Sequence, residues 1–164
     1  MGTSVARVAA VLAWLLAGSA ALHALEVTSS QGQAELRAGD ASWRRAVIGR
    51  PIGAETTLTT WRDSSITAER DGVRLDVAAF TQIKVTSVLP ETAILLHAGR
   101  IDVHADADVS VEAGGFTVRA TDAAFTVSRR GATVHEGTIT VIDPSGTATA
   151  ISAPESASFV LHSP

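Results

Sequence analysis

The chain has 164 residues, of which 46% are hydrophobic and 18% are charged, with a formal net charge of −4 and no cysteine. This apolar fraction is typical of a folded protein rather than a disordered one, and the length favours one domain. The lack of cysteine excludes disulfides, thiolate metal sites and thiol nucleophiles, and the lack of a basic surplus argues against a nucleic-acid partner.

The N-terminal segment has the layout of a secretory signal peptide. After Arg7, an uncharged run from Val8 to Ala24 begins with helix-forming apolar residues and ends in small ones. Cleavage after Ala21 leaves small residues at both recognition positions, and cleavage after Ala24 stays open. The run is shorter than the roughly 20 residues of a membrane span, and no basic cluster follows it. We therefore predict a signal-peptide helix over 1–24 and an extracytoplasmic, periplasmic mature protein with no stable membrane span.

From Leu25 onward the sequence is typical of an all-β protein. Short alternating runs rich in valine, isoleucine, threonine and phenylalanine recur between glycine and proline turns. These runs predict strands over 34–38, 57–61, 64–69, 73–78, 81–88, 93–98, 100–113, 116–121, 123–128, 132–137, 138–143, 147–152 and 156–161. Asp71-Gly72 is expected to form a tight type I′ hairpin turn, which needs positive φ at both central residues.

The spacing of the turns indicates the architecture. Turn residues recur at roughly the 8–12 residues expected of a sandwich, barrel or β-solenoid. Phe-Thr-Val occurs at 116–118 and again at 125–127, which is a faint internal repeat of the kind that stacked turns produce. We predict a single domain over 25–164, built as a β-roll or sandwich that becomes solenoid-like in its second half.

The segment from Arg100 to Val111 carries the strongest candidate for a metal site. Its polar residues stand at every second position, and Asp102 and His104 lie about 7 Å apart on one face of a strand, close enough to converge on one ion. A metal needs further ligands, for which His97 and His135 are the candidates. The alternative is a solvated acidic face that discourages edge-to-edge pairing, with the apolar residues turned to the core. This alternative is preferred, and no metal or other cofactor is expected.

Two further pairs are weak candidates for ligand binding. Trp43 and Trp61 each stand beside arginine, and their faces could stack on a sugar or an aromatic ligand. Arg129-Arg130, beside a glycine, could grip an anion, although charged hairpin tips are commoner. The sequence contains no phosphate loop, dinucleotide turn or calcium loop. We therefore expect no catalytic residues and no enzymatic activity.

The order of the turns and strands resembles the FecR-type domain, an extracytoplasmic sensor module. The resemblance covers about Gly32 to Val141, and no single piece of it is specific. The matching residues are Trp43, Gly49, Ile52-Gly53, Leu58 to Thr60, Ser65, Asp71-Gly72, Ile83, Ala98-Gly99, Ile101, Val103, Phe116, Val118, Thr121, Phe125, Val127, Glu136-Gly137, Ile139 and Val141. The family usually carries a Gly-Thr pair just before the phenylalanine strand, and Asp122-Ala123 stands at this place here, so the local turn is expected to differ. The cytoplasmic segment and the spanning helix of the membrane-bound regulators have no counterpart.

The resemblance implies a secreted, periplasmic binding or scaffolding module of a bacterial cell envelope. Its partner would be an envelope protein or a cell-wall ligand, met through a β surface or an edge strand. Two alternatives stay open. One is a small cupin-like metal-binding β-barrel enzyme built on His97, Asp102, His104 and His135. The other is a carbohydrate-binding envelope module that uses the two tryptophans.

Overall fold

The computed structural model describes residues 24–159, which form strands joined by turns, with no helix among them. The strands are β1 (Leu25–Gln31), β2 (Ala34–Ala38), β3 (Arg44–Arg45), β4 (Pro51–Ile52), β5 (Thr56–Thr60), β6 (Ser65–Arg70), β7 (Val73–Val77), β8 (Gln82–Ser87), β9 (Thr92–Ala98), β10 (Arg100–Ala105), β11 (Val109–Ala113), β12 (Phe116–Ala120), β13 (Ala123–Ser128), β14 (Gly131–Ile142), β15 (Ala148–Ser152) and β16 (Ser156–Ser158). The prediction of an all-β protein is confirmed for this part of the chain. The predicted signal-peptide helix lies outside the described residues, apart from Ala24. Within residues 24–159 no helix could cross a membrane.

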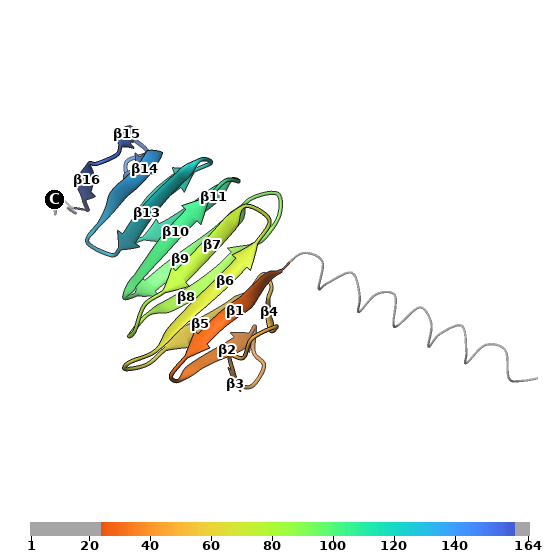
Figure 1. Ribbon diagram of the computed structural model, residues 1–164. Helices are drawn as coiled ribbons and strands as arrows, with labels where there is room; N and C mark the ends of the chain where they lie inside the picture. Colours follow the sequence, from red (N-terminus) through yellow and green to blue (C-terminus); the bar gives the residue numbers. More distant parts are fainter. Residues whose placement is uncertain (1–23, 160–164) are drawn as a thin grey trace, which may run out of the picture.

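The strands build two sheets that share the long strand β14. Sheet A has the order β4-β1-β6-β7-β10-β13-β14-β16, and sheet B has the order β3-β2-β5-β8-β9-β11-β12-β14-β15. The chain passes repeatedly from one sheet to the other, so the strands follow one another along the molecule from β1–β4 at one end to β14–β16 at the other (Figure 1). Strands β9 and β11 pair in parallel because β10, between them in the chain, lies in the other sheet. The predicted roll or sandwich, with a solenoid-like turn in the second half, is therefore present.

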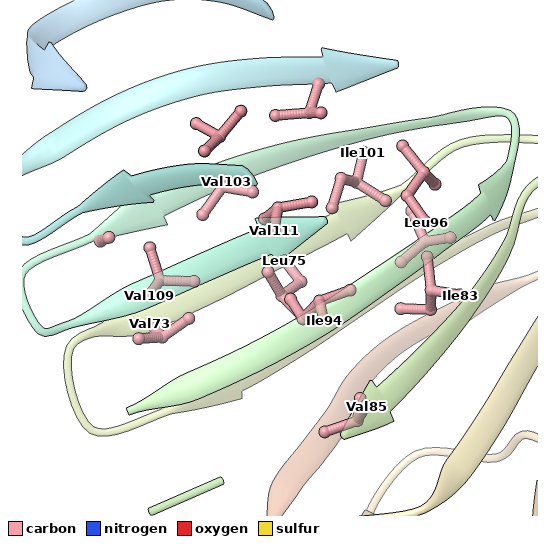
Figure 2. Close-up of a cluster of buried hydrophobic side chains, with 14 of the residues drawn as sticks. Val73, Leu75, Ile83, Val85, Ile94, Leu96, Ile101, Val103, Val109 and Val111 are labelled. Atoms are coloured by element: carbon pink, nitrogen blue, oxygen red, sulfur yellow. The ribbon is translucent and has the colours of Figure 1, made fainter. Parts of the chain in front are cut away.

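The core lies between the two sheets. Alternation turns every second side chain of a strand inward, and these positions carry valine, isoleucine and leucine. Ile101 and Val103 of sheet A meet Ile94 and Val111 of sheet B in one apolar cluster, and all four are almost completely buried (Figure 2). Packing between two apolar inner faces therefore holds the described part of the chain together, in the absence of any disulfide.

The prediction of one strand over 100–113 is wrong. The segment forms two strands, β10 in sheet A and β11 in sheet B, joined by a turn at residues 106–108. Alternation continues through the turn because both strands face the same core, so the pattern alone does not reveal the change of sheet. Strand β10 is central, paired with β7 and β13, so its acidic side chains do not guard a sheet edge as expected.

Four further elements differ from the prediction. Strand β1 was not predicted, and a register shift between Val27 and Ser29 interrupts its alternation. The two-residue strands β3 and β4 were also missed, since they are too short to show a period. The two strands predicted over 132–137 and 138–143 form the single strand β14, which pairs first with β13 and then with β12.

Glycines lie where the chain passes from one sheet to the other. Gly99, between β9 and β10, has a φ of 84°, and a Cβ there would lie 2.2 Å from the Thr81 hydroxyl. Gly137, where β14 changes partners, has a φ of 75°, and a Cβ there would lie 2.1 Å from the Asp122 carbonyl. Only glycine fits such sites. The hairpin at Asp71-Gly72 joins β6 to β7 as predicted, but only its glycine has positive φ, so the turn is not type I′.

Candidate functional site

Strand β15 forms an open edge of sheet B. It pairs with β14 on one side, and no other described strand pairs with it. Its five residues are Ala-Thr-Ala-Ile-Ser, and four of them are exposed. The strand carries no charge, proline or bulge, which are the usual devices that stop an edge from pairing with another chain.

The register shows which main-chain groups of β15 face outward. Asp143 N donates to Thr147 O, and Ala153 N donates to Gly137 O, so residues 147, 149, 151 and 153 bond to β14. Hydrogen-bonded and non-bonded positions alternate along an antiparallel pair. The N–H and C=O groups of Ala148 and Ala150 therefore point away from β14, toward the open edge. An extended segment could bind them and continue the sheet.

The opposite end of the molecule has protected edges. The outermost strands there are β3 and β4, each of two residues. They carry Arg44, Arg45 and Pro51, so that charge, short length and a missing N–H all oppose pairing. The contrast makes β15, rather than the edges at the opposite end, the candidate binding surface of the described chain; β16, the edge of sheet A beside it, has only three residues.

A rigid turn fixes the start of β15. The Asp143 carboxylate accepts hydrogen bonds from the Ser145 N–H at 2.8 Å, the Ser145 hydroxyl at 2.6 Å and the Thr147 N–H at 2.9 Å. The hydrogen bond from the Ser145 hydroxyl, followed by that from the Thr147 N–H, lowers the pKa of Asp143 below its ordinary value of 3.8. The turn is therefore tightest when Asp143 is ionised.

The four candidate metal ligands do not converge. His97 lies at the end of β9 in sheet B, whereas Asp102 and His104 lie on the outer face of β10 in sheet A. Thr126 donates a hydrogen bond to Asp102 and lies 2.7 Å from the Nε2 atom of His135. Residues 24–159 contain no group of three or more side chains placed to hold a metal ion.

A positively charged arginine, Arg74, lies beside His104 on the outer face of sheet A. Arg74 pairs with His104 across β7 and β10, and its guanidinium donates to Asp76 at 2.9 Å. Burial acts to raise the pKa of Asp76, but hydrogen bonds from Arg74 and Thr67 outweigh it and lower that pKa below 3.8. The outer face of sheet A is thus occupied by its own cross-strand network. This geometry gives the cupin-like alternative no ligand set.

The two tryptophans lie apart. The guanidinium of Arg37 stacks over the Trp43 ring at 4.7 Å from its centroid, so one face of that ring is already covered. Trp61 follows β5, at the other end of β2, where its main-chain N–H donates to Gln33 O. Trp43 and Trp61 are 39% and 48% exposed as whole residues, respectively. They do not form one stacking platform, which weakens the carbohydrate-binding alternative.

Arg129 and Arg130 lie at the tip of the hairpin between β13 and β14, and both are exposed. The main chain here has a structural role, because Arg130 O accepts a hydrogen bond from Phe159 N at 2.8 Å. The side chains stand in solvent as charged hairpin tips commonly do.

The strand over 147–152 was predicted, but its role as an open edge was not. Its lack of charge, in "TATAIS", was the available signal. Which strand ends a sheet depends on the order of all the others, and the local sequence does not carry that order. Comparisons of the chain with protein-family models, with curated proteins and with solved structures found no match. Function is therefore argued from the geometry of the described residues.

Proposed function

We propose that the chain is a non-catalytic binding or scaffolding module of the FecR-like kind in a bacterial cell envelope, and that an extended segment of a partner protein adds to sheet B along β15. The open, uncharged edge of β15 carries this proposal. Main-chain hydrogen bonds to Ala148 and Ala150 give affinity, and side chains beside the edge give selectivity.

The resemblance to the FecR-type domain supports the same conclusion. Many of its matching residues are turn glycines and inward apolar positions, such as Gly99, Val103 and Phe125. These residues build the two-sheet body. A binding module acts through its contacts with a partner, so β15 and the residues that flank it determine which partner binds.

The charges beside the edge favour a partner other than a second copy. Asp143 lies in the turn before β15 and Glu155 in the turn after it, so antiparallel pairing of two copies along β15 would place the acidic turn of one copy near the acidic turn of the other. Both groups are acidic and exposed or nearly so, and opposed like charges destabilise a pair of strands. The partner segment should therefore be extended, uncharged in its middle and basic at its flanks.

The test is photocrosslinking in the native cell, with a photoreactive amino acid placed at position 148 instead of Ala148. We expect an adduct with an envelope protein. The variant Ala150→Pro should abolish it, because it removes an N–H from the open edge without removing a bond to β14. The matched variant Ala150→Ser keeps that N–H and should keep the adduct.

A reactive residue at Thr86, exposed on β8, serves as the site control and should not give the same adduct. Three outcomes would overturn the proposal: no adduct with an envelope protein, an adduct that survives Ala150→Pro, or an adduct only with a second copy of this chain.

A further inference from the structure

A cavity lies at the end of the molecule opposite to β15. It has a volume of about 290 Å³ and lies where β2, β3, β4 and β5 meet. Apolar side chains, including Leu36, Ala38 and Pro51, form part of its wall, and two arginines, Arg44 and Arg50, complete it. The volume is at the lower limit of known small-molecule pockets.

Arg44 reaches this cavity because of its register. It pairs with Leu36 across β2 and β3, and Leu36 is buried on the inner side of sheet B. Arg44 therefore lies on the inner side too, whereas its neighbour Arg45 pairs with Glu35 on the outer side. The inward charge of Arg44 on the edge strand β3 also hinders pairing with another chain. That role does not explain why Arg50 lines the same cavity.

Arg50 enters from sheet A on a main chain that β1 holds in place. Its carbonyl accepts a hydrogen bond from Val27 N at 3.0 Å, and the preceding Gly49 N donates to Val27 O at 2.8 Å. The Nε atom of Arg50 is buried and has no hydrogen-bond partner in the structure. A buried donor without a partner costs free energy, but the Nε atom of Arg37, which does not line the cavity, is in the same state. A ligand is therefore expected to meet Arg50 through the part of its side chain that lines the cavity.

No carboxylate of the described chain neutralises this pair. Within residues 24–159, the ion pairs closer than 4.0 Å join Arg74 to Glu69 and Asp76, and Lys84 to Glu55. Arg44 and Arg50 thus bring two positive charges to a partly apolar cavity in a protein whose net charge is −4. Guanidinium groups bind carboxylate and phosphate oxygens through paired hydrogen bonds.

We infer that this cavity binds a small organic anion, with its carboxylate or phosphate head on Arg44 and Arg50 and a short apolar body against Leu36 and Pro51. The site is independent of the partner strand proposed for β15, because it lies at the other end of the two sheets. Each head group suits the arginines, so the choice between carboxylate and phosphate is left to measurement.

The test is isothermal titration of the purified mature chain with hexanoate and with hexyl phosphate at millimolar concentration. Hexanol supplies the tail without the charge, and inorganic phosphate supplies the charge without the tail. We expect saturable binding of at least one amphiphilic anion, tighter than either control. The tighter of the two identifies the head group.

Three variants assign the binding to the cavity. Arg44→Gln and Arg50→Gln should each weaken binding by about tenfold, the loss expected for one charge-assisted hydrogen bond. Arg45→Gln removes the same charge from the outer side of the same strand and should leave binding unchanged. Arg50→Lys keeps the charge and should retain part of the affinity, which covers the case in which Arg50→Gln does not fold.

Four results would overturn the inference. They are no saturable binding of either anion, equal binding of inorganic phosphate, equal binding of hexanol, or affinities unchanged in both Arg44→Gln and Arg50→Gln. None of them bears on the adduct at β15, so this site and the proposed function can fail separately.

Discussion

Neighbouring residues of the segment from Arg100 to Val111 have opposite environments. Val103 is completely buried between the sheets, whereas Asp106 is exposed in the turn between β10 and β11. Only the main chain of Asp106 makes a fixed contact, donating to Gly72 O at 2.6 Å. Ser110 faces outward as its position predicts, but its hydroxyl bonds to Glu91 and the residue is buried.

We predict that Val103→Asp destabilises the protein by about 4 kcal/mol or more, because it buries a charge with no partner. Asp106→Ala should stay within about 0.5 kcal/mol of the unmodified chain, because only an exposed carboxylate is lost. Urea unfolding of both variants measures these changes. Equal midpoints would contradict the inward and outward facing of the two residues.

At the scale of strands, the alternation of apolar and polar residues predicted most of the strands but not the sheet to which each strand belongs. The strands over 34–38, 73–77 and 116–120 were found where their apolar period placed them. Both sheets present the same apolar inner face, so the period gives the inward residues without saying which sheet a strand joins. For the same reason the sequence did not show that β10 is central and β15 lies at an edge.

The cavity at the β2–β5 end of the molecule could not be predicted from the sequence for a related reason. Arg44 lies on β3 and Arg50 directly before β4, and each of these strands has only two residues and therefore shows no period. Only the pairing of β3 with β2 and of β4 with β1 places both residues at the same cavity. By contrast, the charged tip at Arg129 and Arg130 was visible in the sequence, because a hairpin turn is a local feature.

The turn between β14 and β15 should loosen in acid. Because hydrogen bonds hold the pKa of Asp143 below 3.8 in the folded chain, its contribution to stability is present above that value and is lost as the pH falls through the lowered pKa. We expect the amide signals of Ser145 and Thr147 to shift with a midpoint below pH 3.8 in an NMR titration. Asp143→Asn should remove this transition, and a midpoint at or above 3.8 in the unmodified chain would contradict it.

At the scale of the whole molecule, the two ends of the sheet pair differ in how their apolar interior is covered. Phe159, after β16, stacks on Phe116 of β12 with ring centroids 4.7 Å apart and planes at 7°. This stack covers the apolar interior beside β14, so the end that carries the open edge of β15 is itself packed. At the other end no pair of aromatic rings stacks among the described residues, although Arg37 covers Trp43 there, and the cavity with Arg44 and Arg50 lies at that end.

Phe159→Ala should therefore destabilise the packed end. We expect a loss of about 2 kcal/mol, because a half-buried ring and its stacking contact are removed together. Phe80→Ala is the matched control, since the Phe80 ring is 63% exposed, and it should stay within about 0.5 kcal/mol of the unmodified chain. Urea unfolding gives both values, and hydrogen exchange should show the loss of protection first in β14 and β16. Equal effects of the two substitutions, or faster exchange confined to β1 and β2, would show that the stack does not close this end.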